Sequence, residues 1–239
     1  DIAKDVADLV LLGDDFKIIP AAIREGRGIV DTIRKIITYV ISDSFTEVIL
    51  IGSALALKLP LPLTALQILW INIIGDGPPA LALAFEKTDD AVMERKPEKK
   101  RASLLTPEMR VIIFIIGIVT DVLLLLLFLW FWKYQAVSLE HARTLVFVGL
   151  GINSLFFVFS CKNLRKNIWQ YNVFDNRFLQ GSAFAGIALF VLPVYLPFVR
   201  QMLDLAPLKW FDWGLLGGLA VANIALIECA KWVFIRLER

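Results

Sequence analysis

Six apolar segments of about 20 residues each set the strongest limit on how this chain folds. A helix of about that length crosses the roughly 30 Å hydrocarbon core of a bilayer. The 58% share of hydrophobic residues also exceeds that of an ordinary soluble domain. We therefore predict an all-α membrane protein, a six-helix transmembrane bundle. The expected spans are residues 35–57, 62–85, 110–133, 142–161, 178–199 and 211–235.

The basic residues gather in two of the connections between these spans. The connection after the second span carries Lys87, Arg95, Lys96, Lys99, Lys100, Arg101 and Arg110. The connection after the fourth span carries Lys162, Arg165, Lys166 and Arg177. By the positive-inside rule we expect both basic loops and both termini on the cytoplasmic side. The formal net charge is only +2, which gives no reason to expect nucleic acid as a partner.

Residues 1–33 form the sizeable polar region ahead of the first span, and residues 34–239 form the membrane part. The stretch "ADLVLL" at residues 7–12 is typical of a short strand, and "GDD" after it is typical of a turn. A helix is expected from about Phe16 into Arg34, running directly into the first span. The sequence thus predicts a short α/β tail in front of the bundle.

The second span, "LQILWINIIGDGPPALALAF" at residues 66–85, carries polar residues at its centre. A carboxylate such as Asp76 costs about 2.5–3.5 kcal/mol at the middle of a bilayer, so it persists only with partners or a function. Asn72 lies four residues earlier and therefore on the same helical face. Both side chains offer oxygen ligands.

Two consecutive prolines, Pro78 and Pro79, interrupt the same span. They lack the amide hydrogens that a regular helix uses to bond the carbonyls four residues earlier. The carbonyl oxygens of Ile74 and Gly75 are therefore expected to be free. Broken helices at the bilayer midplane are how transporters build ion sites, because free carbonyls are tolerated only where they face protein or a polar cavity.

The first span supplies complementary groups within "YVISDSFTEVIL". Asp43, Ser44 and Glu47 fall toward one helical face, so carboxylates from two spans are expected at similar depth. With no Lys or Arg at that level, they need protons or a hard cation such as Ca²⁺, Mg²⁺, Na⁺ or K⁺. The alternative is that these polar groups join helices by hydrogen bonds. Their combination with the proline pair favours an ion site.

Three stretches resemble one known family. "TALQILWINIIGDGPPALALAFE" resembles the sixth transmembrane helix of type II P-type cation-transporting ATPases, and "IRKIITYVISDSFTEVIL" resembles their fifth. "DIAKDVADLVLLGDDFKIIPAAIREGR" is similar to the end of their HAD-like phosphorylation domain, and Met93, Arg95 and Pro97 match their M-x-R-x-P element. The resemblance covers the whole chain and looks calcium-pump-like and prokaryotic. It implies the final third of such a pump.

The resemblance implies that Glu47, Asn72 and Asp76 are cation ligands. Four further candidates come from the same two spans: the side chains of Asp43 and Ser44 and the carbonyls of Ile74 and Gly75. On the span that matches the family's eighth helix, Ser154 beside Asn153 stands where calcium pumps have a glutamate. Because Ser44 and Gly75 also replace the usual asparagine and threonine, we expect one cation site rather than two.

Three further polar features are less specific. Asp121 in the third span is either an ion-path or proton-accepting carboxylate or a protonated group hydrogen-bonded within the bundle. Glu228 and Lys231 form an i, i+3 pair that is expected to stabilise a helix end. His141, the one histidine, is expected to be a solvated group in an outer loop.

The family resemblance implies the membrane portion of an ATP-driven cation pump. ATP and Mg²⁺ would bind to upstream domains, because the D-K-T-G-T motif of the family does not occur in these residues. This fragment alone is therefore expected to be inactive and to hold no catalytic residue. Its expected partners are the lipid bilayer of the plasma (cell inner) membrane, the upstream domains and the transported cation, Ca²⁺ among others. The alternative is a non-enzymatic cation channel or secondary transporter.

Overall fold

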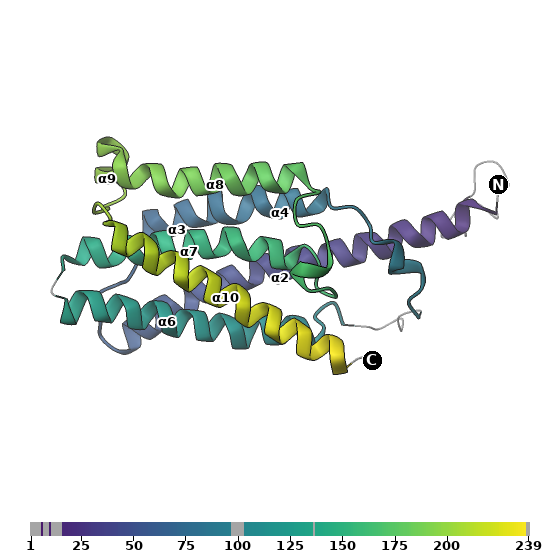
Figure 1. Cartoon of the computed structure of the whole chain (residues 1–239), viewed down its shortest axis with the longest axis horizontal. Helices are drawn as coiled ribbons and strands as arrows, with labels where there is room; N and C mark the ends of the chain where they lie inside the picture. Colours follow the sequence, from purple (N-terminus) through teal and green to yellow (C-terminus); the bar gives the residue numbers. More distant parts are fainter. Residues whose placement is uncertain (1–5, 7–9, 11–15, 97–102, 136, 238–239) are drawn as a thin grey trace.

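The computed structural model describes residues 6, 10, 16–96, 103–135 and 137–237, and the regular structure in this part of the chain is helical. The helices form one elongated bundle, with the N- and C-terminal ends of the chain at the same end (Figure 1). Five helical runs of the described residues are long and apolar enough to cross a membrane. They are α2 (Ile18–Ala56), the run Pro107–Tyr134, α7 (Leu139–Cys161), α8 (Arg177–Tyr195) and α10 (Trp210–Leu237). The predicted all-helical membrane bundle is confirmed to this extent.

The sixth apolar segment is helical but built from three shorter pieces. These are α3 (Ala65–Ile71), the π-helical segment η1 (Asn72–Asp76) and α4 (Gly77–Ala84). Thr64 starts α3 with a capping box, since its side chain accepts from the Gln67 amide and the Gln67 side chain accepts from the Thr64 amide. Pro78 and Pro79 occupy the first turn of α4, where a missing amide hydrogen breaks no bond inside α4. The expected irregularity therefore lies directly before the prolines.

The helix α2 continues without interruption from Ile18 to Ala56. Its 39 residues span roughly 58 Å at 1.5 Å per residue, about twice the thickness of the hydrocarbon core. Its N-terminal part projects beyond the bundle (Figure 1). The expected continuation of a polar helix into the first span is thus confirmed. The strand expected at residues 7–12 lies outside the described residues except for Val10.

The other long runs contain short pieces or connections of their own. Residues Pro107–Tyr134 comprise α5 (Pro107–Arg110), η3 (Val111–Ile116), α6 (Gly117–Leu129) and η4 (Trp130–Tyr134). Three short helical pieces lie in connections: η2 (Asp90–Met93), η5 (Ile168–Gln170) and α9 (Pro197–Met202).

The centre of the bundle is α7, which packs against α2, α3, α4, α6, α8 and α10. Its side chains Leu145, Phe147 and Val148 are fully buried, and the Phe147 ring lies 5.4 Å from that of Phe190 on α8. At Gly151 a Cβ atom would lie only 2.3 Å from the Phe190 ring, so the absence of a side chain allows this close approach. The tight packing of α7 and α8 fixes the helices that surround the polar residues described below.

Polar contacts tie the loops to the helices at the end of the bundle where the termini lie. Arg27 of α2 donates to the carbonyls of Val92 and Arg95 at 3.0 and 3.1 Å, and Arg95 pairs with Asp31. Lys166 pairs with Asp89 at 2.6 Å. Partial burial opposes ionisation of Asp89, but the Lys166 and Ala91 contacts outweigh it and hold the pKa of this carboxyl below its ordinary value. These contacts join α2 and the α7–α8 connection to the loop that follows α4.

The Glu228–Lys231 pair proves to be deeply buried. The Lys231 ammonium lies 2.7 Å from Glu228 and donates to the carbonyls of Ser160, Asn163 and Lys166, each at 3.1 Å. Glu228 in turn accepts from the Asn167 side chain and the Ile168 amide at 3.0 and 2.8 Å. The pair therefore anchors the α7–α8 connection to α10, which extends the predicted structural role.

Candidate functional site

The candidate site lies where one face of α2 meets η1. Tyr39, Asp43 and Glu47 follow one another at intervals of four residues on α2, which places them on one helical face. Asn72 and Asp76, also four residues apart, bound η1. The two elements are in contact. Each element thus presents a row of oxygen-bearing side chains to the other.

Glu47 and Asn72 form the first pair across this contact. The Asn72 side-chain amide donates to both Glu47 carboxylate oxygens, at 3.2 and 3.0 Å. It also donates to the Ile68 carbonyl at 2.9 Å. Because the amide nitrogen is committed to these acceptors, the Asn72 side-chain oxygen points elsewhere and is not used by this contact. The predicted proximity of Glu47 and Asn72 is present in the structure.

The Gly75 carbonyl, predicted to be freed by the prolines, has a partner from α2. The Tyr39 hydroxyl donates to it at 2.5 Å. The same hydroxyl lies 2.7 Å from the Ser154 hydroxyl on α7, which also contacts the Asp43 carboxyl. One chain of hydrogen bonds therefore runs from the unwound backbone of η1 through Tyr39 and Ser154 to Asp43. A freed carbonyl in a buried place requires such a donor or a cation.

Asp76 and Asp43 form the second pair. Their carboxyl groups interact directly, and Asp76 is only 8% exposed. Among the described residues, nothing donates a hydrogen bond to the Asp76 Oδ1 atom. Two adjacent carboxyls with an unpartnered oxygen are stable only when a proton or a positive ion sits with them. This pair is the part of the site with the greatest need for a positive charge.

The remaining predicted ligands lie around these two pairs. Ser44 is exposed on α2, and Ile74 is half-buried within η1. Asn153 accepts from the Asn223 side-chain amide at 2.7 Å. Asp121 is buried on α6, a third helix, and is separate from the Glu47–Asn72 contact. The structure thus brings together Glu47 with Asn72 and Asp43 with Asp76. Asn153 lines a small cavity together with Asp43, and Asp121 contacts Thr46 of α2.

No group of three or more histidine, cysteine, aspartate or glutamate side chains within the described part of the chain is arranged to hold a metal ion. The oxygen donors come instead as two carboxylate-containing pairs plus backbone carbonyls of η1. Such a set suits a hard cation, whose coordination uses carboxylate, amide and carbonyl oxygens together. Further ligands are needed to complete the coordination of a divalent ion.

Tyr39 is the residue of this site that the sequence analysis missed. Its spacing of four residues from Asp43 was a usable signal, because it places the hydroxyl on the same face of the helix. The expectation for His141 was wrong. This side chain lies in the first turn of α7, is 13% exposed, and has its Nε2 atom 3.3 Å from the Asp212 carboxylate. It belongs to a packed contact between α7 and α10.

Comparison with known families decides the class of this protein. A family model described as "Cation transporting ATPase, C-terminus" matches residues 60–233. The chain belongs to the cation-transporting ATPase family. This confirms the resemblance inferred from the two polar spans, and the match includes η1 with its Asn72 and Asp76.

Curated members of the cation-transporting ATPase family are similar over nearly the whole chain. A "Calcium-transporting ATPase" of Bacillus subtilis is 32% identical over 95% of the chain, and a "Calcium-transporting ATPase type 2C member 2" of Rattus norvegicus is 32% identical over 97%. A "Probable cation-transporting ATPase F" of Mycobacterium bovis is 34% identical over 89%. The match covers 25%, 24% and 23% of these three relatives. The chain therefore spans about a quarter of their length.

Proposed function

We propose that this chain is the membrane portion of an ATP-driven cation pump and supplies part of its intramembrane cation site. The observation that carries the proposal is the meeting of α2 and η1, where Glu47 pairs with Asn72 and Asp43 pairs with Asp76 beside unwound backbone. Membership of the cation-transporting ATPase family supports the same reading and disfavours a channel or a secondary transporter.

We take Glu47, Asn72 and Asp76 as the main ligands and the carbonyls of Ile74 and Gly75 as additional ones. Ca²⁺ takes six to eight oxygen ligands, which a mixture of carboxylate, amide and carbonyl groups supplies. Several relatives are named calcium-transporting ATPases, so Ca²⁺ is the cation we propose. The ligands that these residues do not provide would come from a helix upstream in the complete pump. One site rather than two is proposed, because Ser44 and Ser154 are poor replacements for stronger ligands.

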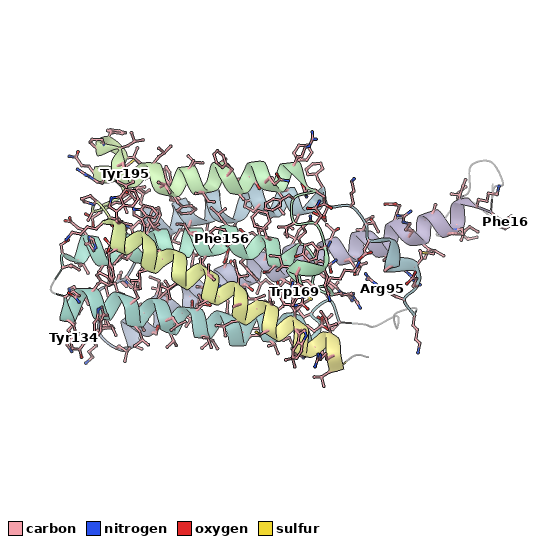
Figure 2. The ribbon with its side chains drawn as sticks, viewed as in Figure 1. Phe16, Arg95, Tyr134, Phe156, Trp169 and Tyr195 are labelled. Carbon is pink, nitrogen blue, oxygen red and sulfur yellow. The ribbon has the colours of Figure 1, made fainter. Side chains whose placement is uncertain are left out.

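The run from Ala65 to Ala84 is proposed as a sixth membrane span, with its π-helical turn near the middle of the bilayer. Both termini and the two basic loops are placed on the cytoplasmic side. Figure 2 supports this orientation, because Arg95 and Phe16 lie at one end of the molecule and Tyr134 and Tyr195 lie at the other. Basic residues favour the cytoplasmic side, while tyrosine and tryptophan favour the membrane interfaces. The membrane is proposed to be the plasma (cell inner) membrane.

The continuous helix α2 is proposed as the mechanical link between the upstream domains and the cation site. Upstream domains of the complete pump would bind ATP and Mg²⁺ and take the phosphoryl group on an aspartate. Any tilt of the exposed part of α2 moves Asp43 and Glu47 relative to η1, because one uninterrupted helix carries both parts. The pump then alternates between conformations that bind the cation with different affinity.

The proposal is tested by Asp76→Asn in the complete pump. The substitution keeps the size of the side chain but removes the charge that the cation neutralises, so calcium-dependent phosphorylation by ATP should be abolished. Glu140→Gln is the matched control, because Glu140 is an exposed acidic residue in the first turn of α7 and lies away from η1. Normal calcium-dependent phosphorylation in the Asp76→Asn variant would contradict the ligand assignment.

A further inference from the structure

A surface recess lies where the end of α4 meets the start of α8, at the end of the bundle where the termini lie (Figure 1). Its volume is about 240 Å³. Two phenylalanines, two acidic residues, two basic residues and Asn176 line it. Pockets that enclose a whole drug-sized molecule measure about 300–1,000 Å³. This recess is therefore of a size to hold a small polar headgroup.

The two acidic residues of the recess already have partners within the protein. Lys162, whose side chain is only 3% exposed, lies 3.6 Å from the Glu86 carboxylate and also forms an ion pair with Asp175. The Glu86 carboxylate accepts a further hydrogen bond from the Asn176 side-chain amide at 3.0 Å. Neither acid therefore needs a cation from outside the protein.

The two basic residues of the recess have no such partners. Lys87 lies just beyond the end of α4, Arg177 is the first residue of α8, and both are exposed. Neither side chain forms a hydrogen bond or an ion pair with another residue in the described part of the chain. Three basic groups, counting Lys162, thus face two acidic ones. The excess of one positive charge matches a ligand with a single negative charge.

Two aromatic rings form the apolar side of the recess. The Phe85 and Phe178 rings lie 5.0 Å apart, and the two residues are 65% and 67% exposed. Phe85 is the C-cap of α4, and Phe178 lies in the first turn of α8, so each ring lies close in sequence to one of the two basic residues. An apolar surface next to basic groups suits an amphipathic ligand that carries an anionic group beside hydrocarbon.

Asn176 holds the two walls of the recess together. Its side-chain amide donates to the Ala82 carbonyl of α4 at 3.0 Å, and its side-chain oxygen accepts from the Leu179 amide of α8 at 3.0 Å. The residue itself is buried. One side chain thus caps α8 and binds the end of α4. The recess is therefore preformed, and a ligand does not have to order it.

We propose that this recess binds an anionic phospholipid of the cytoplasmic leaflet. Its phosphate lies on Lys87 and Arg177, and its glycerol and upper acyl carbons lie against the two phenylalanines. The site rests on the orientation proposed above, which puts this end of the bundle at the cytoplasmic surface, where the negative potential of anionic lipids attracts basic side chains. A bound lipid bridges α8 and α4, and α4 continues directly from η1. Its occupancy therefore stabilises the position of α4 in the bundle.

The test measures thermal unfolding of the purified complete pump in a neutral detergent. Three probes are added separately: dioctanoyl phosphatidylglycerol, dioctanoyl phosphatidylcholine, and glycerophosphoglycerol, which is the first headgroup without acyl chains. A ligand that binds the folded protein raises the Tm by mass action. We expect a saturable rise in Tm with phosphatidylglycerol, a much smaller rise with phosphatidylcholine, and none with glycerophosphoglycerol.

The double variant Lys87→Gln/Arg177→Gln removes both basic groups from the recess. It should need roughly thirtyfold more phosphatidylglycerol for the half-maximal rise, because each basic side chain near anionic lipid contributes on the order of fivefold to binding. Lys96→Gln/Arg236→Gln is the matched control, since it removes the same charges from exposed residues that do not line the recess. This control should respond as the unmodified pump does. Should the double variant not fold, Lys87→Gln alone should need roughly fivefold more lipid.

The Asp76→Asn variant separates this site from the proposed calcium site. It should keep the full rise in Tm with phosphatidylglycerol even though it loses calcium-dependent phosphorylation. Equal rises with the two lipids would overturn the proposal, as would a full rise with glycerophosphoglycerol, which would indicate a site for soluble phosphodiesters. An equal loss in the two double variants would assign the effect to overall charge and overturn it too. Unchanged Tm values with all three probes would mean that another part of the complete pump covers the recess, which would also refute lipid binding there.

Discussion

Replacing Tyr39 with phenylalanine removes the hydroxyl that donates to the Gly75 carbonyl at 2.5 Å and contacts Ser154 at 2.7 Å. The ring itself is fully buried and packs 5.9 Å from Phe157, so the substitution leaves its apolar contacts in place. Only the hydrogen bonds change. The variant therefore tests how the hydrogen bond from Tyr39 to the Gly75 carbonyl affects the cation-free protein.

The expected magnitude follows from the burial of the Gly75 carbonyl. A buried acceptor left without a donor costs about 1–3 kcal/mol, so the cation-free variant should be destabilised by about that amount. If the carbonyl is a cation ligand, the Tyr39 hydroxyl has to leave it when the cation binds. The substitution then penalises mainly the cation-free state, and a difference of about 1 kcal/mol corresponds to roughly fivefold tighter cation binding.

The assay measures the calcium concentration that gives half-maximal phosphorylation by ATP, together with the Tm in the absence of calcium. Tyr39→Phe should lower the Tm and also lower the half-maximal calcium concentration by roughly fivefold. Tyr171→Phe is the matched control. Its hydroxyl donates to the Phe159 carbonyl at 2.7 Å in the α7–α8 connection, away from η1. That control should lower the Tm without a change in calcium affinity.

Two results would refute the reasoning about Tyr39. Calcium affinity that is unchanged in Tyr39→Phe would mean that the Gly75 carbonyl is not a ligand. Weaker affinity would mean that the hydroxyl supports the occupied site rather than competing with it. In either case the bond between Tyr39 and Gly75 would be purely structural.

Two further substitutions test the packing that holds the site. Gly151→Ala places a Cβ atom 2.3 Å from the Phe190 ring and should lower stability by about 1–3 kcal/mol, measured as a drop in Tm. Gly181→Ala is the control, because no atom lies within 4 Å of the added Cβ, and it should be neutral or slightly stabilising. Equal Tm values for the two variants would show that the α7–α8 approach is not tight. Lys231→Met removes the ammonium group that pairs with Glu228 at 2.7 Å and should lower the stability of the folded protein by about 3–5 kcal/mol. Adding Glu228→Gln should recover part of that stability, because it removes the unpaired buried carboxylate. A double variant whose Tm is no higher than that of Lys231→Met would mean that Lys231 acts through its carbonyl contacts alone.

The helical spans were predictable from sequence because hydropathy over about 20 residues is a local property. The expected span at residues 142–161 corresponds to α7 (Leu139–Cys161), and the one at residues 211–235 lies within α10 (Trp210–Leu237). The interruption before Pro78 was also predictable, since proline lacks an amide hydrogen in any context. The form it takes, a π-helical turn from Asn72 to Asp76, was not.

The candidate site was predictable in part. Spacing predicted that oxygen-bearing side chains of the first two spans lie on single helical faces at similar depth, and the family resemblance implied Glu47 and Asn72 in one ligand set. The direct hydrogen bond between Asn72 and Glu47 came from the structure. The hydrogen bond from Tyr39 to the Gly75 carbonyl was not predicted, because the rotation of α2 about its axis decides whether the Tyr39 hydroxyl reaches that carbonyl. The burial of His141 against Asp212 was missed for the same reason, since it depends on where α10 begins relative to α7.

The sequence by itself determined that this chain forms helices long and apolar enough to cross a membrane, that a further apolar segment is interrupted at its centre, and which oxygen-bearing residues lie on the faces of α2 and η1. Those properties depend on residues within a few positions of one another. The tertiary structure alone decided the connections between helices: Tyr39 to Gly75, Ser154 to Asp43, and the chain of Thr120, Asn223 and Asn153 around a small cavity. Each of these contacts depends on the relative rotation and depth of two helices, which are set by packing around α7 and which no local pattern encodes.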